Sequence, residues 1–279
     1  MNIGVRIQTP RSWNHEDFLH SLRSRLVATY YSPDETIDPS VELLITNNLS
    51  AVELTELPHL QALICPTSGR EGLPLQELKN RNIAIYLNSG QIGDCVAAYA
   101  EYYVLAFSVL NDRKRLDGKK IVILGYGNIG SRIFKRLLPR GGNYIIVRKN
   151  VDVSSIDGPC EVVTLHDART AISDADIVLN ALPLNNETKG ALTRNVYYRS
   201  SSVVLSLSRA GIIDEYAIAQ SVLDGKLSAA ILDVYPPELD KFKNLHPRLV
   251  LTGHTAGIWG GGTEHLVNFV LKSVRRETR

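Results

Sequence analysis

The sequence is poor in cysteine, in net charge and in long apolar runs, and each shortage excludes a class of protein. Its 279 residues include three cysteines, Cys65, Cys95 and Cys160, which are far apart and offer no Cys-x-x-Cys or Cys/His spacing for a metal ion. An odd number of isolated cysteines fits a reducing compartment. We therefore expect a cytoplasmic protein without a metal site.

The low net charge and the lack of a long apolar run restrict the partners. A formal charge of +2 gives no strong field that would favour nucleic acid or an anionic membrane. No run of 18 apolar residues occurs, and the first residues, MNIGVRIQTP, lack the apolar segment of a signal peptide. With 44% hydrophobic and 22% charged residues, the chain is expected to be soluble and long enough for two modest domains.

The first part of the chain alternates between strand-like and helix-like patterns. Phe18, Leu22 and Leu26 recur at a spacing of four residues, which places them on one helical face, and Pro74 opens a second helix. This alternation is typical of a parallel sheet with helices on both faces. The expected strands cover residues 3–7, 42–46, 60–66 and 83–88.

A polar turn at residues 88–93 ends this first pattern. Asp94 has the residue type of an N-cap and precedes a long apolar helix expected at 95–111. Alternation then restarts, so we expect two doubly wound α/β domains, one at 1–93 completed by a C-terminal helix within 259–279, the other at 94–258. The second domain's expected strands are 121–125, 144–148, 176–180, 202–207, 228–234 and 249–252, with helices at 129–138 and 214–224.

A glycine-rich turn joins the first of these strands to its helix. The sequence Gly125-Tyr126-Gly127-Asn128-Ile129-Gly130 matches the G-x-G-x-x-G pattern of dinucleotide-binding folds, in the strand–turn–helix context that the pattern requires. Gly125 would permit the tight turn, Gly127 the approach of a pyrophosphate, and Gly130 the close packing of helix on strand. Free N–H groups at the helix start would face the anion. The alternative is a tight turn without a ligand.

The end of the next strand indicates which dinucleotide binds. An acidic residue there would bind the ribose 2′-hydroxyl of NAD, whereas a basic residue accommodates the 2′-phosphate of NADP. The strand NYIIVRKN has no acid at its end; Arg148 and Lys149 follow Gly130 by 18 and 19 residues. Since a guanidinium can bind the phosphate through charge-assisted hydrogen bonds, we expect NADP, with NAD as the alternative. An exposed basic strand end without this role is the other interpretation.

Three later segments place polar residues after expected strands: LSLSRAGIIDEYAI with Arg209, AAILDVYPPE with Glu238, and LTGHTAG with His254. In a doubly wound sheet, ligands bind outside the carboxyl ends of the strands. Residues that are far apart in the sequence can therefore meet at one ligand.

These motifs together resemble the D-isomer-specific 2-hydroxyacid dehydrogenases, a family that includes glyoxylate/hydroxypyruvate reductases and phosphoglycerate dehydrogenases. The resemblance is strongest in ILGYGNIG, DADIVLNALPLNNETKGALT, SRAGIIDEYAI, ILDVYPPE and TGHTAG. It implies a Rossmann dinucleotide-binding domain at 94–258 and a flavodoxin-like substrate domain in the rest, both doubly wound around parallel sheets. It also implies a small 2-keto or 2-hydroxy acid as substrate and a homodimer.

The resemblance also implies roles for individual residues. Arg209 matches the arginine that binds the substrate's carboxylate and carbonyl oxygen, His254 the general acid/base, and Glu238 the carboxylate that pairs with this histidine. Asp233 matches the aspartate that holds the nicotinamide carboxamide. The backbone of Ser68 and Gly69 would bind the substrate carboxylate. Further cofactor-binding positions implied in the motifs are Asn128, Ile129, Leu182 and Pro183.

Elementary chemistry fits these implied roles. Reduction of a 2-keto acid adds a hydride to the carbonyl carbon and a proton to its oxygen. An imidazolium beside a carboxylate can give that proton near neutral pH, because the carboxylate raises the pKa of the histidine. An arginine offers paired donors that match a carboxylate and polarise the carbonyl.

The sequence departs from the family pattern at several positions. Gly253 replaces the proline that usually precedes the histidine, Ala210 replaces a glycine, and Ala98 replaces a glutamate, with Glu101 nearly one turn later. Arg70 is an added cation after the loop glycine. The segment before the glycine turn is also shorter than in the family, where an extension of it helps to wrap the dimer partner and to shape the active-site mouth.

Two functions remain open from the sequence. The first is an NADPH-preferring reductase of glyoxylate- or hydroxypyruvate-like acids. The second is a non-enzymatic regulatory protein that senses a dinucleotide on the same fold. The presence of Arg209, Glu238 and His254 together favours the enzyme, and Glu238 disfavours a formate dehydrogenase, which has glutamine there.

Overall fold

The computed structural model describes the chain except for residues 9–14, 109–114, 153, 194–195 and 279. It divides into two compact units. Unit 1 comprises residues 1–92 and 260–279, and unit 2 comprises residues 93–259. Each contains one sheet whose strands are all parallel, so the prediction of two doubly wound parallel-sheet domains is confirmed.

Unit 1 has a five-stranded sheet in the order β2-β1-β3-β4-β5. This is the flavodoxin-like order, in which the chain moves outward from β1 in both directions. Its strands are β1 (Ile3–Arg6), β2 (Thr29–Tyr30), β3 (Leu43–Thr46), β4 (Ala62–Cys65) and β5 (Ala84–Leu87).

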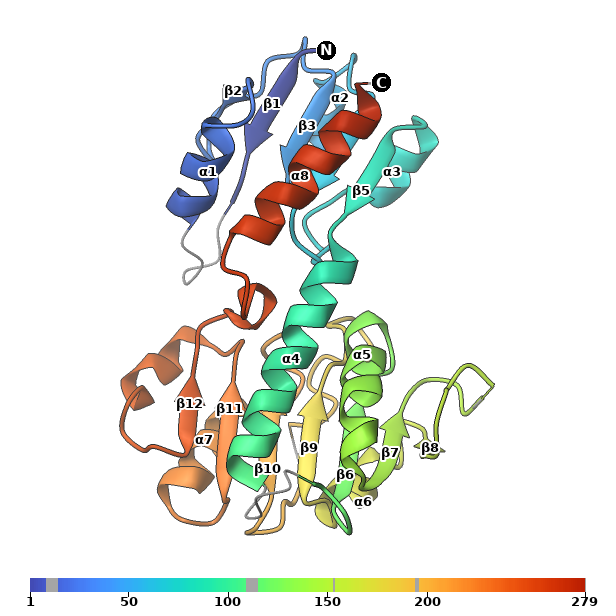
Figure 1. The fold of residues 1–279 in the computed structure, drawn as a ribbon, viewed down its shortest axis with the longest axis vertical. Coiled ribbons are helices and arrows are strands. Elements are labelled where there is room, and N and C mark those ends of the chain that lie inside the picture. Colours follow the sequence, from blue (N-terminus) through green and yellow to red (C-terminus); the bar gives the residue numbers. More distant parts are fainter. Residues whose placement is uncertain (9–14, 109–114, 153, 194–195, 279) are drawn as a thin grey trace. The chain divides into compact units, whose positions relative to one another are not determined.

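Helices cover the sheet of unit 1. Leu54 and Leu78, from two of these helices, are buried in one cluster with Leu44 and Leu63 of the sheet. The C-terminal helix contacts β4 and the first helix, and Figure 1 shows it crossing one face of this sheet. The helices are α1 (His15–Arg23), α2 (Ala51–Thr55), α3 (Leu75–Asn80) and α8 (Glu264–Glu277).

Unit 2 has a seven-stranded sheet in the order β12-β11-β10-β9-β6-β7-β8. The order reverses between β6 and β9, where a Rossmann sheet has its ligand-binding switch point. The strands are β6 (Lys120–Leu124), β7 (Asn143–Val147), β8 (Glu161–Val163), β9 (Ile177–Asn180), β10 (Val203–Ser206), β11 (Ala229–Leu232) and β12 (Leu249–Leu251).

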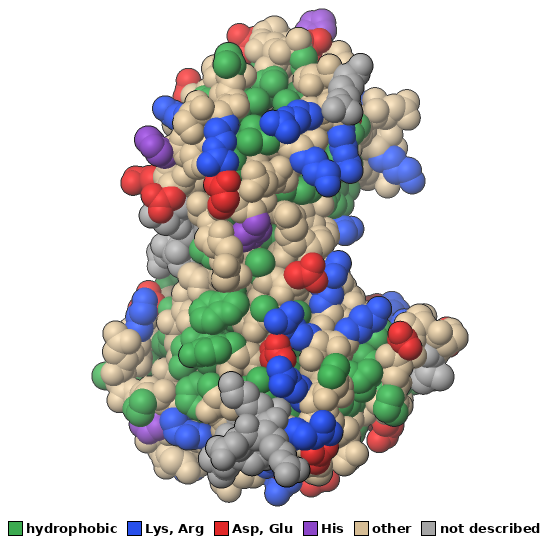
Figure 2. Space-filling model, in the orientation of Figure 1, with side chains coloured by type: hydrophobic (Ala, Val, Ile, Leu, Met, Phe, Trp, Pro, Cys, Tyr) green, Lys and Arg blue, Asp and Glu red, His purple; other side chains and the backbone are tan. Residues whose placement is uncertain are grey.

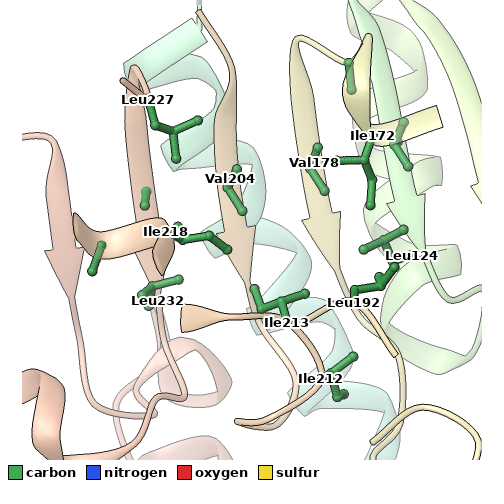
Figure 3. Close-up of a cluster of buried hydrophobic side chains, with 14 of the residues drawn as sticks. Leu124, Ile172, Val178, Leu192, Val204, Ile212, Ile213, Ile218, Leu227 and Leu232 are labelled. Carbon is green, nitrogen blue, oxygen red and sulfur yellow. The ribbon is translucent and has the colours of Figure 1, made fainter. Parts of the chain in front are cut away.

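Two pairs of helices enclose this sheet. Ile172 of α6 and Ile218 of α7 pack on one face, in the buried cluster that Figure 3 shows with Leu124, Val178 and Val204. On the other face lie α4 and α5 (Figure 1). The helices are α4 (Ser89–Ser108), α5 (Asn128–Leu137), α6 (Ala168–Ser173) and α7 (Glu215–Leu223), with short 3₁₀ turns η1 (Leu138–Arg140), η2 (Pro237–Phe242) and η3 (Ala256–Ile258).

Ion pairs connect α4 to α5. Arg136 and Arg140 both contact the Glu101 carboxylate, at 2.6 and 2.8 Å, and the Glu101 side chain is 13% exposed. Arg132 contacts Asp94 at 2.8 Å. A half-buried carboxylate shared by two guanidiniums contributes more to stability than an isolated surface ion pair does. These contacts therefore hold α5, the helix that follows the glycine turn, against α4.

Two local predictions were wrong. The long helix α4 begins at Ser89, so residues 89–93 are helical rather than a turn, and Asp94 lies inside the helix instead of capping it. The Asp94 carboxylate, which was predicted to cap the helix, instead accepts a hydrogen bond from Arg132. The predicted helix end at 109–111 lies outside the described residues.

The first helix also ends earlier than expected, at Arg23, so Leu26 lies beyond it. Phe18 and Leu22 lie on this helix as predicted, and both are fully buried. Four short elements, β2, α2, β8 and α6, had not been expected. None exceeds six residues, a length at which hydrophobic periodicity gives little signal.

Figure 2 shows basic and acidic side chains interspersed over one face of the molecule, in keeping with the low net charge. Among the described residues, no helix is both long and apolar enough to cross a membrane.

Candidate active site and dinucleotide pocket

The glycine turn occupies the switch point of the unit 2 sheet. Gly125 has φ = +94°, and a side chain there would meet the backbone oxygen of Ala181 at 2.8 Å. A Cβ on Gly130 would lie 1.9 Å from the Gly125 oxygen, so α5 packs directly on the turn. By contrast, a Cβ on Gly127 would meet no atom within 4 Å. The middle glycine therefore faces open space at the start of α5.

A hollow of ≈ 540 Å³ adjoins the turn. Backbone N–H groups at the start of a helix attract anions, and here the helix start at Asn128 follows the two glycines that line the hollow. The walls come from the end of β7 and from the loops after β6, β7, β8 and β9. Its lining includes Gly125, Gly127, Arg148, Lys149, Leu182 and Pro183. These six are among the ten predicted cofactor-binding residues; the other four, Asn128, Ile129, Gly130 and Asp233, are not among the lining residues.

Both basic residues at the end of β7 already have partners. Arg148 donates to the Asp152 carbonyl at 3.1 Å and to Ser155 Oγ at 3.0 Å, and its guanidinium lies 5.9 Å from the Tyr126 ring centroid. Lys149 Nζ contacts Glu187 at 2.6 Å, and both of these side chains are mostly exposed. Glu187 also lines the hollow, so it places a negative charge beside Arg148 and Lys149, where only positive charge had been predicted. The sequence analysis missed this residue.

The carboxyl ends of the next strands carry buried polar groups. Asn180 is the last residue of β9 and Ser206 the last residue of β10. The Asn180 side chain donates a hydrogen bond to Ser206 Oγ at 3.2 Å. Asp233 follows β11 and is 1% exposed. Its Oδ1 accepts hydrogen bonds from Thr252 Oγ1 (2.7 Å), Thr255 N (2.8 Å) and Ala256 N (3.1 Å). Through this oxygen the buried carboxylate holds the segment after β12.

His254 lies in that segment with an unusual backbone. Its φ is +69° and that of Gly253 is +65°, and the His254 N–H donates to the Asp233 carbonyl. A non-glycine residue in this region is uncommon and is often found at functional sites. Glu238, in η2, is exposed and makes no hydrogen bond or ion pair with a described residue. The pairing of Glu238 with His254 stays a prediction.

Arg209 lies in the loop after β10, half-buried, with Nη1 donating to the Ser208 carbonyl at 3.0 Å. The loop is held by Glu215, the first residue of α7, whose carboxylate accepts from Gly211 N at 3.0 Å. Glu215 is 3% exposed. The sequence analysis missed its role, because nothing in the local pattern signals that this helical carboxylate is buried.

Burial raises the pKa of Glu215 to about 7. Hydrogen bonds from the backbone lower this pKa, but their effect is smaller than that of burial. The folded state then holds a proton that the unfolded state releases, so this group's contribution to stability is fully present below pH 4.5 and is lost as the pH rises through 7. A shift of this size corresponds to about 3 kcal/mol.

We expect Glu215→Gln to remove this contribution to the pH dependence, because glutamine keeps an acceptor for Gly211 and does not titrate. Urea unfolding of wild type and variant at pH 5 and pH 8 measures the difference. Glu161→Gln, which changes an exposed carboxylate on β8, is the matched control. An identical pH dependence in wild type and Glu215→Gln would show that Glu215 titrates normally.

Ser68 and Gly69 belong to unit 1, in the loop after β4, and both are half-buried. The buried Cys65 thiol faces this loop, with Sγ 3.5 Å from the Thr67 carbonyl and 3.8 Å from the Gly69 carbonyl. Burial raises the pKa of this thiol, which makes it an inert packing group rather than a nucleophile. Among the described residues, no group of three or more His, Cys, Asp or Glu side chains could hold a metal ion.

Residues 108–256, more than half of the chain, match the family described as D-isomer specific 2-hydroxyacid dehydrogenase, NAD binding domain. The chain belongs to the D-isomer specific 2-hydroxyacid dehydrogenase family. It is therefore an oxidoreductase with an NAD(P)-binding domain, of a family that acts on small 2-hydroxy acids.

Relatives in the 2-hydroxyacid dehydrogenase family span most of the chain. A glyoxylate/hydroxypyruvate reductase of Arabidopsis thaliana is 26% identical over 250 residues, covering 80% of this chain and 74% of the relative. A hydroxypyruvate reductase of Thermotoga maritima is 25% identical over 224 residues, 72% of each chain. The D-lactate dehydrogenase of Aquifex aeolicus, solved with NAD and lactic acid, has a TM-score of 0.70 at 16% identity, covering 99% of this chain and 95% of that one.

One departure from the 2-hydroxyacid dehydrogenase pattern has a clear conformational meaning. Proline fixes φ near −65°, whereas Gly253 has φ = +65°. The histidine loop of this chain therefore follows a path that proline cannot take. The glycine is an adaptation to that path rather than a simple loss of rigidity.

Proposed function

We propose that the protein is an NADPH-preferring reductase of small 2-keto acids of the glyoxylate or hydroxypyruvate kind. The observation that carries the proposal is the glycine turn at the switch point of the unit 2 sheet, with polar residues at the carboxyl ends of the same parallel strands. The printed names of the Arabidopsis thaliana and Thermotoga maritima relatives support this substrate class.

The residues around the hollow suit a dinucleotide. Gly127 leaves room for a pyrophosphate at the start of α5, and Leu182 and Pro183 supply apolar wall on the β9 side. Asp233 Oδ2 would accept a hydrogen bond from the carboxamide of a nicotinamide, because its Oδ1 is engaged by the His254 segment. The chemistry that a reduced nicotinamide supplies when bound is a hydride for the carbonyl carbon.

The other roles belong to the chain's own side chains. Arg209 would bind the substrate carboxylate and polarise the carbonyl oxygen as negative charge develops on it. His254 would donate the proton to that oxygen. Glu238 would raise the pKa of the histidine once the two approach each other. Backbone N–H groups of Ser68 and Gly69 would bind the substrate carboxylate.

The cofactor preference can be tested on Arg148 and Lys149. We expect NADPH to bind more tightly than NADH by about 1.5–3 kcal/mol, or roughly one to two decades in affinity, through charge-assisted hydrogen bonds to the 2′-phosphate. Arg148→Ala combined with Lys149→Ala should abolish this difference and leave NADH binding unchanged. Fluorescence titration of the reduced nicotinamide measures both affinities.

Two further variants sharpen this test. Glu187→Gln should tighten NADPH binding several-fold, because it removes the negative charge that lies 2.6 Å from Lys149. Lys226→Ala, which removes an exposed lysine paired with Asp224 outside the hollow, should change neither affinity. Equal or tighter binding of NADH by the wild-type protein would contradict the preference for NADP.

The competing function is a regulatory protein that binds a dinucleotide without catalysis. It predicts NADPH binding but no turnover of any 2-keto acid. The presence of Arg209 and His254 after β10 and β12 favours the enzyme. The homodimer that the family resemblance implies, and the cytoplasmic location, stay predictions.

A further inference from the structure

A chain of hydrogen bonds connects α4 to the segment that carries His254. The Tyr99 hydroxyl lies 2.7 Å from Thr252 Oγ1, and Thr252 Oγ1 donates to Asp233 Oδ1 at 2.7 Å. Thr255 N and Ala256 N donate to the same oxygen. The residues on both sides of His254 are therefore held by one carboxylate oxygen, and Tyr99 extends the network to α4.

The direction of these bonds follows from the groups themselves. Thr252 donates its single hydroxyl proton to Asp233 Oδ1, so Tyr99 must be the donor to Thr252. Burial raises the pKa of Tyr99, and the nearby Asp233 charge raises it further. Tyr99 thus stays protonated and remains a donor at any pH used in an assay.

The ring of Tyr99 contacts the other end of the same segment. Tyr99 is fully buried, and its ring packs edge-on against Trp259, with centroids 5.2 Å apart and planes at 89°. Tyr103 packs on it at 4.7 Å. One side chain therefore touches the segment 252–259 twice, through its hydroxyl at Thr252 and through its ring at Trp259.

The segment needs this support because its backbone is strained. A non-glycine residue with positive φ is strained and persists only when its surroundings hold it. His254, with φ = +69°, is such a residue, and bonds to Asp233 lie two residues before it, at Thr252, and one residue after it, at Thr255. Loss of the Thr252 bond would allow the histidine backbone to relax.

We propose that Tyr99 and Thr252 are positioning residues for His254. Together with Asp233 they hold its backbone in the left-handed conformation and so set the direction of its imidazole. The effect on position follows from the geometry of unit 2 alone. Its effect on turnover rests on the proposed role of His254 in catalysis.

The test of position uses NMR of the full-length protein. The His254 ring signal is assigned by its loss in His254→Ala. We expect it to shift or broaden in Thr252→Val and in Tyr99→Phe, but not in Thr252→Ser, which keeps the hydroxyl. The ring signal of His59, exposed in unit 1, is the internal control and should not move in any variant. An unchanged His254 signal in Tyr99→Phe, which preserves the ring packing, would overturn the proposal even if Thr252→Val does not fold.

The kinetic test separates positioning from general stability. We expect kcat to fall about 10-fold in Thr252→Val, with the KM for NADPH within about two-fold of wild type and kcat restored in Thr252→Ser. Tyr99→Phe should add nothing to Thr252→Val, because the hydroxyl acts through Thr252; additive losses would contradict that connection. If the NMR result holds while the wild type reduces no 2-keto acid, the positioning stands and the proposed function fails.

Discussion

His254→Ala is expected to reduce kcat for the best 2-keto acid by about 10²–10⁴-fold, the range usual for loss of a general acid. The imidazole would supply the proton to the carbonyl oxygen, and His254 follows β12 as Arg209 follows β10 and Asp233 follows β11. NADPH affinity should change little, since the role assigned to His254 is toward the substrate. Steady-state kinetics and fluorescence titration measure the two effects separately.

The matched control is His59→Ala, which removes an exposed histidine of unit 1 and should leave kcat unchanged. Glu238→Gln should move the alkaline limb of the kcat profile to lower pH if the carboxylate raises the pKa of the histidine during turnover. A near-wild-type kcat in His254→Ala across the pH range would mean that another group donates the proton, or that the chain is not a reductase by this mechanism.

Gly130→Ala is expected to destabilise unit 2 by about 3 kcal/mol or more, at the upper end of the cost of overpacking. Its Cβ would lie 1.9 Å from the Gly125 oxygen, a backbone atom that can move only if the turn opens. Alanine gains about 1 kcal/mol of helix propensity over glycine, which is too little to offset such a clash. Thermal and urea unfolding measure the loss.

Gly127→Ala is the matched control, because its Cβ meets nothing within 4 Å and its φ of −84° suits alanine. It should keep wild-type stability but weaken the binding of both dinucleotides, since the methyl group enters the space proposed for the pyrophosphate. Equal stability of the two variants would show that α5 does not pack on the turn as described. Unchanged binding in Gly127→Ala would show that the pyrophosphate lies elsewhere.

The parts of the fold that the sequence predicts are those with strong local signals. The strands that lead into Gly125 and Asp233 are continuous apolar runs, and burial on both faces of a parallel sheet makes such runs easy to recognise. The glycine turn was recognisable because its three glycines fit one short pattern, and the backbone leaves no room for a side chain at Gly125 and Gly130. These features depend on residues close together in the sequence.

The missed features depend on contacts between distant residues. Asp94 has the composition of an N-cap, but its carboxylate contacts Arg132 of α5 and the helix continues through it. The contact from Tyr99 to Thr252 joins residues 153 positions apart, and no local pattern encodes it. Glu215 resembles an ordinary acidic residue in a first helical turn, and its burial becomes evident only in the folded unit.

Reduction of hydroxypyruvate and glyoxylate with NADPH, followed by the absorbance of the reduced nicotinamide, tests the central claim most directly. The account predicts turnover of at least one of these acids, faster at limiting NADPH than at the same concentration of NADH, and lost in His254→Ala. Tight NADPH binding without oxidation of NADPH by any acid of a 2-keto acid panel would contradict it and favour the regulatory protein.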